Sequence, residues 1–190
     1  KELGYRHIDS GAMYRAITLY MLRNSVNISH ELEVRNALDN ISLSFTTNEK
    51  TQRSEICLNG ENVAHHTHDM IVAEKVSDVA AIKEVRQFAV KQQQEMGKDR
   101  GIVMDGRDIG TVVFPFADQK FFIDASPEIR AQRRYLQLRK QDVDADFQEI
   151  LSALVERDNQ DKNRSIASLV AAEDSIIIDT ENMKIDEVMQ

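Results

Sequence analysis

The chain has 190 residues, a formal net charge of -8 and a single cysteine, Cys57; 42% of its residues are apolar and 29% are charged. This composition is typical of a water-soluble globular protein, and no apolar run approaches the roughly 20 residues of a membrane span. The lone cysteine excludes a disulfide framework, and the acidic balance argues against long nucleic acid as a partner. We therefore expect a cytoplasmic protein with no membrane partner.

The first residues, Lys1-Glu2-Leu3-Gly4, have the pattern of a last helical turn that ends at a left-handed glycine. A helix that ends at Gly4 would begin ahead of Lys1. We therefore expect at least one helix, and whatever precedes it, upstream of this sequence.

Four short apolar runs each end at an aspartate. The runs span residues 5–8, 101–104, 120–123 and 175–178, and the aspartates are Asp9, Asp105, Asp124 and Asp179. Helical patterns lie between them at residues 12–22, 79–96, 127–140 and 146–158. This alternation predicts an α/β fold with a parallel sheet flanked by helices. The aspartates would then gather at the carboxyl ends of the strands, where such sheets bind ligands.

Each of these aspartates has an alternative role as a helix N-cap. We favour that role for Asp124 and Ser126, because Pro127 follows at the first helical position.

The stretch between residues 41 and 63 has a different pattern. Residues 41–45 and 54–58 alternate apolar and polar side chains, and the turn pair Asn59-Gly60 follows. The pattern predicts half-exposed antiparallel strands, which would form a small β insertion in the α/β framework.

Residues 104–111, with the sequence MDGRDIGT, have the densest chemistry in the chain. Here a strand ends, and glycines flank an adjacent arginine and aspartate. Arg107 could bind a phosphate or carboxylate with both arms of its guanidinium, and Asp108 could accept from the amino group of a base. The alternative is a turn held by a salt bridge.

A second candidate lies at the start of the helix after Asp9, where we expect Ser10 to be the cap. Arg15 lies in the first turns of this helix, near the positive end of its dipole, where a cation gains nothing. A bound anion would explain its position, and the alternative is a solvated surface arginine.

Arginines are also dense late in the chain. Arg130, Arg133 and Arg134 fall on one side of a helix, and a second charged run follows at residues 156–164. Two such clusters joined by a flexible link at residues 141–146 favour a mobile lid over solvated helix faces. The histidines at 65, 66 and 68 lack the spacing of a zinc site, so we expect a polar loop and no metal site there.

Taken in order, these segments resemble bacterial cytidylate kinases over nearly the whole chain. The matching segments are residues 8–15, 105–115, 124–134 and 156–164. The resemblance implies a P-loop nucleoside monophosphate kinase fold and one partial kinase unit. Its core would be residues 1–38 and 95–190, with a monophosphate-binding insertion at residues 39–94 and a helical lid at residues 130–164 inside the core.

The resemblance also implies a role for individual residues. The residues that would read the cytosine ring are Ser77, Arg86 and Asp108. Those of the acceptor-phosphate pocket are Ser10, Arg15 and Arg107. Those near the sugar are Tyr14, Arg157 and Asp161, with Arg164 near the phosphates. Those of the lid, which would face the ATP phosphates and act with Arg107 as the catalytic charges, are Arg130, Arg133 and Arg134.

The implied reaction is transfer of a phosphoryl group from ATP, with Mg²⁺, to CMP or dCMP by a monomer. The nucleophile would be a phosphate oxygen that is already anionic, so alignment and charge stabilisation suffice without a general base. Asp108 and Arg86 would offer the base an acceptor and a donor, which predicts CMP and dCMP over UMP.

The family's phosphate-binding loop, Gly-x-x-x-x-Gly-Lys-Ser/Thr, is not among the 190 residues. We expect it upstream, and we expect these residues alone to be inactive. Two alternatives stay open, a nucleotide-binding module without catalysis and another small-molecule kinase of the same fold.

Overall fold

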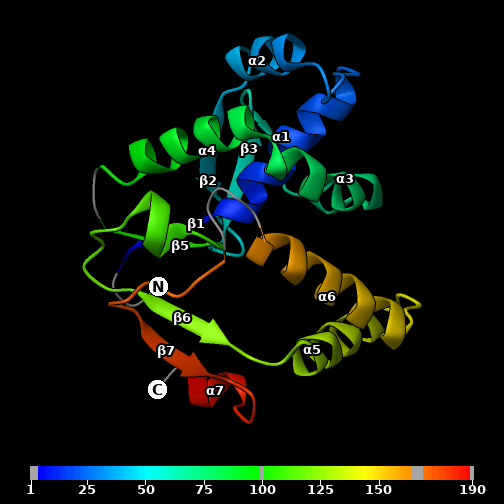
Figure 1. Cartoon of the computed structure of the whole chain (residues 1–190), viewed down its shortest axis with the longest axis vertical. Coiled ribbons are helices and arrows are strands. Elements are labelled where there is room, and N and C mark those ends of the chain that lie inside the picture. The colour runs from blue at the N-terminus through cyan, green and yellow to red at the C-terminus, as the bar shows by residue number, and fades with distance from the viewer. Residues whose placement is uncertain (1–3, 99–100, 164–168, 189–190) are drawn as a thin grey trace. The chain divides into compact units, whose positions relative to one another are not determined.

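Helices and strands alternate along most of the chain, which divides into two units, Lys1–Ile109 and Gly110–Gln190 (Figure 1). The structure is a computed structural model that describes residues 4–98, 101–163 and 169–188. The first unit contains β1 (Arg6–Asp9), α1 (Ser10–Arg23), α2 (Glu31–Asp39), β2 (Leu43–Thr47), β3 (Ser54–Leu58), β4 (Glu61–Asn62), the 3₁₀ turn η1 (His66–His68), α3 (Met70–Ala81), α4 (Lys83–Met96) and β5 (Ile102–Asp105). The π-helical turn η2 (Ile109–Val113) follows in sequence, and then β6 (Phe121–Asp124), α5 (Pro127–Arg139), α6 (Phe147–Asn163), β7 (Ile176–Asp179) and α7 (Ile185–Val188).

Two pairs of parallel strands confirm the mixed α/β fold. β1 pairs with β5 in the first unit, and β6 pairs with β7 in the second. The register sets Asp9 opposite Asp105 and Asp124 opposite Asp179. Among the described residues, the aspartates predicted at one rim are thus seen as two pairs of neighbouring strand ends.

The core of the first unit is built around α1. Met13, Ile17 and Met21 are fully buried and recur at every fourth position, so they form one continuous stripe. α3 packs against this helix (Figure 1), and buried residues of β2, β3, α2 and α4 complete the cluster. This packing fixes the start of α1 relative to β1, which leads directly into it.

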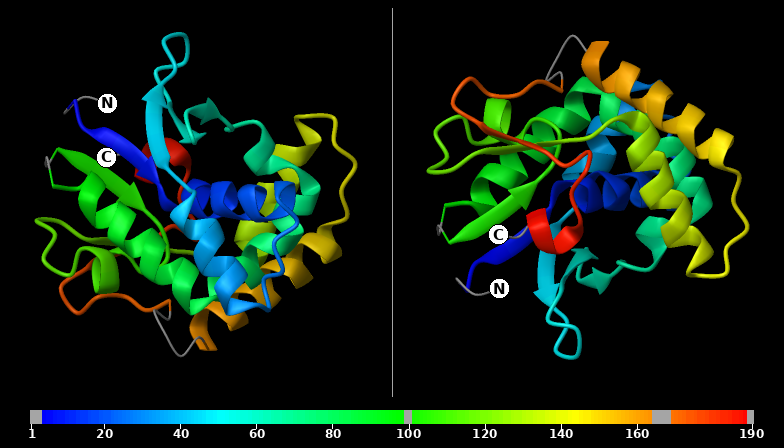
Figure 2. Two further views of the ribbon diagram at one scale, coloured as in Figure 1. Left: turned by 90° about the horizontal axis from the view of Figure 1, so that it is seen from above. Right: turned by 90° about the horizontal axis from the view of Figure 1, so that it is seen from below.

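The predicted antiparallel insertion is present as a three-stranded sheet of β2, β3 and β4. Asn59 (φ 51°) and Gly60 (φ 85°) form the two-residue turn between β3 and β4, which needs two left-handed residues. Both views of Figure 2 show the β2–β3 hairpin extending away from the helices of this unit. The prediction of half-exposed strands was wrong for the end of β3, where Ile56, Cys57 and Leu58 are all buried. Ile56 and Leu58 belong to the core cluster around α1, and Cys57 lies beside Thr46 of the neighbouring strand.

The single helix predicted over residues 79–96 is in fact two helices. α3 ends at Ala81, Ile82 is extended (φ -69°, ψ 127°), and α4 begins at Lys83. The Arg86 side chain donates to the Ala80 carbonyl at 3.2 Å and so satisfies one of the carbonyls left open at the end of α3. A long-range contact of Arg86, described below, accompanies this break, and helical periodicity alone does not reveal it.

The predictions for the N-terminal residues and for the start of α5 have separate outcomes. The helical turn predicted at residues 1–3 lies outside the described residues, whereas Gly4 has the expected left-handed conformation (φ 68°). In the second unit, Ser126 caps α5 as predicted, with its Oγ 3.3 Å from the Ile129 nitrogen and Pro127 in the first turn. α5 and α6 lie side by side (Figure 1), with the Tyr135 and Phe147 rings edge to face at 6.3 Å.

A search of the described helices finds none with the length and apolar character of a bilayer span.

Candidate functional site

The carboxyl end of the β1–β5 pair brings together the two segments with the strongest sequence signals. A Cβ placed on Gly106 would lie 2.2 Å from Ser10 Oγ and 2.8 Å from Ile109 Cγ1. Only a glycine therefore lets the segment after β5 pack this closely against the first turn of α1. The His7 Nε2 and Asp105 Oδ1 atoms, both on exposed side chains, are 2.6 Å apart at the same edge.

The N-cap of α1 is Asp9, and the prediction of Ser10 as the cap was wrong. Asp9 Oδ1 accepts from the Ala12 nitrogen at 2.8 Å, while Ser10 is the first helical residue. Ser10 is buried, and its hydroxyl lies against Gly106. The cap thus comes from the residue that ends β1, which leaves Ser10 at the junction between α1 and the segment after β5.

Arg15 folds back toward the N-terminus of α1, the direction in which long helical side chains normally lean. Its Nη2 donates to Asp9 Oδ2 at 2.8 Å, and its Nη1 lies 2.9 Å from the point that a Cβ on Gly11 would occupy. An arginine at a helix N-terminus is unfavourable by about 0.3–1 kcal/mol, and the Asp9 carboxylate offsets this. Arg15 is therefore not a solvated surface residue, because only 21% of its side chain is exposed.

A buried ion pair joins α4 to the segment after β5. Arg86 Nη2 and Asp108 Oδ2 are 2.5 Å apart, and each side chain is only 5% exposed. The guanidinium carbon of Arg86 lies 5.7 Å from the centre of the Tyr14 ring, within the range of a cation–π contact. Arg86 Nε is buried and has no hydrogen-bond partner among the described residues. A buried donor without a partner is rare and marks a place where a ligand could be bound.

The remaining predicted residues of this unit are Ser77 and Arg107. Ser77 is half-buried on α3, one turn before the Ala80 carbonyl that Arg86 contacts. Arg107 is half-buried between Gly106 and Asp108. The unit Lys1–Ile109 therefore contains every residue predicted to read the base or to form the acceptor-phosphate pocket, and also Tyr14.

The three predicted lid arginines share one side of α5, but their guanidinium groups have different partners. Arg130 binds Asp158 of α6 with two contacts, at 2.5 and 3.2 Å, and its Nε donates to the Ala125 carbonyl. Arg133 donates to the Thr180 hydroxyl and carbonyl just after β7. Arg134 donates to a residue of its own helix, Gln137, whose Oε1 lies 3.0 Å away. Two of the three arginines thus hold α5 to other elements of the second unit.

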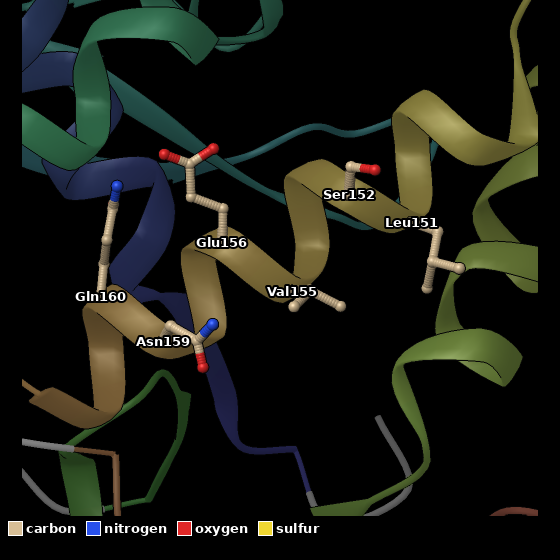
Figure 3. A pocket seen from close by; sticks show the side chains of 6 residues that line it. All are labelled: Leu151, Ser152, Val155, Glu156, Asn159 and Gln160. Atoms are coloured by element: carbon tan, nitrogen blue, oxygen red, sulfur yellow. The ribbon is translucent and has the colours of Figure 1, made fainter.

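The residues predicted to contact the sugar lie on α6. Arg157 is exposed and Asp161 is buried, whereas Arg164 lies outside the described residues. Figure 3 shows a pocket along the same helix. It is lined by Leu151, Ser152, Val155, Glu156, Asn159 and Gln160. None of the predicted site residues lines it, so its position does not strengthen those assignments.

A tight carboxylate contact fixes the start of α5. The Ser126 backbone nitrogen and hydroxyl each donate to Glu181 at 2.7 Å. The backbone N–H of Ser126, then its hydroxyl and the nearby charge of Arg133, hold the pKa of Glu181 below its usual value. Ser126 therefore belongs to the framework of this strand end. The prediction of Asp124 as an N-cap was wrong, because its Oδ1 accepts from the neighbouring Ala125 nitrogen at 2.9 Å and Ser126 is the cap.

Sequence reasoning missed the partners of the predicted arginines. These partners are Asp9, Asp158 and Thr180. Asp9 carried a detectable signal, since it precedes a helix start, but the pairing of Arg130 with Asp158 joins residues 28 positions apart. His66 Nδ1 lies 3.4 Å from Asp69 Oδ2, and the described part of the chain contains no group of three potential metal-binding side chains.

Comparison with known proteins shows which family this sequence matches. The family model for cytidylate kinase matches residues 1–190. The chain is 44% identical to the cytidylate kinase of Bacteroides thetaiotaomicron over 190 residues, which cover 98% of this chain and 83% of that protein. It is 47% identical to the cytidylate kinase of Phocaeicola vulgatus, with the same coverage. It is 42% identical to that of Caldicellulosiruptor saccharolyticus, over 100% of this chain and 83% of that protein.

Proposed function

Because the chain belongs to the cytidylate kinase family, we propose that the protein transfers a phosphoryl group from ATP to CMP or dCMP and so forms the diphosphate. The structural observation that carries the proposal is the buried pair of Arg86 and Asp108. It places a cationic donor and an anionic acceptor together in the interior, where arginine and aspartate side chains are rarely buried.

Arg86 and Asp108 suit the edge of a cytosine ring. Cytosine has an exocyclic amine, which can donate a hydrogen bond to a carboxylate. Beside it are a ring nitrogen and a carbonyl, which can accept hydrogen bonds from a guanidinium. Uracil has an oxygen in place of the amine, and a carboxylate facing that oxygen would be repelled. Ser77, on the helix that ends at the Arg86 contact, is the third proposed base contact.

Ser10, Arg15 and Arg107 are the proposed contacts of the acceptor phosphate. Guanidinium groups bind phosphate oxygens with two parallel hydrogen bonds, which fixes the direction of the attacking oxygen. That oxygen is ionised near neutral pH, so these side chains need only orient it and balance its charge. The proposed sugar contacts are Tyr14, Arg157 and Asp161, with Arg164 near the phosphates.

Residues 130–164 are the proposed lid over ATP, with Arg130, Arg133 and Arg134 as the donors to its phosphates. Arg130 would exchange the Asp158 carboxylate for phosphate oxygens, and Arg133 would exchange the neutral oxygens of Thr180 for charged ones, which are stronger acceptors. Mg²⁺ is commonly held by phosphate oxygens and water with one or two carboxylates. The exposed Asp105 carboxyl group, which ends β5, is an oxygen donor of the kind it prefers. When bound, Mg²⁺ would reduce the negative charge on the phosphates.

The proposal also covers the inserted segment, the oligomeric state and the cellular compartment. Residues 39–94 would form the monophosphate-binding insertion, the protein would act as a monomer, and it would work in the cytoplasm. The lone buried Cys57 is consistent with a reducing compartment.

The test is a calorimetric titration of the full-length protein with CMP, dCMP and UMP, together with a coupled assay of ADP release from ATP. We expect CMP and dCMP to bind at least tenfold more tightly than UMP and to be phosphorylated. Equal affinity for UMP would contradict the assignment of Arg86 and Asp108. Binding of CMP without turnover would favour a non-catalytic module, and turnover of shikimate or gluconate in place of CMP would favour another kinase of this fold.

A further inference from the structure

We propose that Asp9 is a positioning residue that holds the Arg15 guanidinium over the first turn of α1, and that Gly11 leaves the space for it there. The inference rests on the proposed function, in which Arg15 binds the acceptor phosphate. It adds two residues to that site, Asp9 and Gly11, and gives each a physical task.

The first observation is the division of labour between the two Asp9 oxygens. Oδ1 accepts from the Ala12 nitrogen at 2.8 Å, and Oδ2 accepts from Arg15 Nη2 at 2.8 Å. The carboxylate is therefore fixed to the helix backbone by one oxygen while the other holds the arginine. Since Asp9 is also the last residue of β1, the strand, the helix cap and the guanidinium form one rigid chain of contacts.

The second observation is independent and concerns Gly11. A Cβ at this position would lie 2.9 Å from Arg15 Nη1 and 3.0 Å from Asp9 Oδ1. Gly11 lies inside α1 and does not have a positive φ, so its backbone conformation does not require glycine. Glycine inside a helix is less stable than alanine by roughly 0.5–1 kcal/mol. The guanidinium that passes over Gly11 explains why the smallest residue stands there.

The third observation concerns the donors that remain on Arg15. Its Nε is buried and has no hydrogen-bond partner among the described residues. The helix N-terminus beside it attracts anions through its open N–H groups. A phosphate that arrives here meets an arginine that is already ordered, so less side-chain entropy is lost on binding.

The experiment uses four variants of the full-length protein, D9N, G11A, R15A and the double variant D9N/R15A, with D39N as a matched control. Asp39 is an exposed aspartate at the end of α2. Asparagine is also a good N-cap, so D9N keeps the acceptor for the Ala12 nitrogen and removes only the ion pair. In G11A the displaced atom is the far end of a flexible side chain, so α1 is expected to fold normally.

The measurements are the dissociation constants of CMP and of cytidine, which lacks the phosphate, along with KM and kcat. We expect D9N and G11A each to weaken CMP binding about tenfold, which corresponds to about 1.4 kcal/mol. Cytidine binding and the D39N control should not change, the melting temperature of G11A should not fall, and KM for CMP should change more than kcat.

The double variant separates positioning from a direct effect. In the R15A background, D9N should cause no further loss, because Asp9 acts through Arg15. The same loss in both backgrounds, or an equal loss for CMP and cytidine, would overturn the inference. If R15A itself leaves CMP binding unchanged, the phosphate role of Arg15 in the proposed function is wrong as well. If R15A weakens CMP binding while D9N and G11A do not, only the positioning role fails.

Discussion

Two of the arginine–aspartate pairs among the described residues have the same chemistry and the same contact distance but different surroundings. Arg86–Asp108 in the first unit and Arg130–Asp158 in the second both have Nη2 and Oδ2 atoms 2.5 Å apart. The side chains of the first pair are each 5% exposed, whereas those of the second are 30% and 11% exposed. The difference lies in how much water can replace a lost partner.

Burial decides what each pair can do. In the first pair, loss of one partner leaves a charge in an apolar interior, which costs about 3–5 kcal/mol. In the second pair, the Arg130 side chain is 30% exposed, so water can reach its guanidinium and its partner can be exchanged for another anion at a smaller cost. The first pair is therefore suited to a fixed site that reads a base, and the second is suited to a contact that opens when a phosphate arrives.

The strongest test of this comparison is the removal of one charge from the buried pair. We expect D108L to lower the free energy of unfolding by about 3–5 kcal/mol, because Arg86 would stay buried without its partner. Urea denaturation measures this change. The double variant R86M/D108L should recover most of the loss, since two apolar side chains need no partner. A loss in D108L of less than 1 kcal/mol would mean that water reaches Arg86 and that the two pairs are alike.

The framework of each unit could be predicted from the sequence because its signals are local. All four strand ends carry an apolar run followed by an aspartate, and Pro127 marks the start of α5. Asn59-Gly60 likewise specifies its own turn. In each case neighbouring residues contain the whole physical cause, so a short window of sequence is sufficient.

Contacts between distant residues could not be predicted in this way. The break at Ile82 accompanies a contact between Arg86 and Asp108, which are 22 residues apart. The family resemblance assigned Arg86 and Asp108 to the base, but it did not show that they bind each other. Gly11 and Gly106 similarly gain their meaning only from the atoms that pass over them, Arg15 Nη1 and Ser10 Oγ.

A smaller effect is expected at the more exposed pair. We expect D158N to lower the free energy of unfolding by about 1 kcal/mol or less, because Arg130 keeps its contact with the Ala125 carbonyl and gains water. Since a competing carboxylate is removed, KM for ATP should fall about two- to threefold. Steady-state kinetics with varied ATP measures this, and R130A is the matched control, in which KM should rise. A loss of stability in D158N as large as in D108L would remove the distinction between the two pairs.

The smallest effect is expected at Glu181, which is half-buried and accepts two hydrogen bonds from Ser126. Hydrogen bonds from Ser126 hold the folded-state pKa of Glu181 below its usual value. Its contribution to stability is therefore fully present above the unfolded-state pKa and is lost as the pH falls through the folded-state pKa. E181Q should lower the melting temperature slightly at neutral pH, and the difference from the parent protein should shrink as the pH falls through the folded-state pKa of Glu181.

Calorimetric melting curves across the acid range measure this difference, with E173Q as the control because Glu173 is an exposed glutamate of the same unit. E173Q measures what the removal of an exposed carboxylate from the same unit does by itself. A difference for E181Q that grows on acidification would reverse the sign of the argument. It would mean that the protonated form of Glu181 is the one that holds the start of α5.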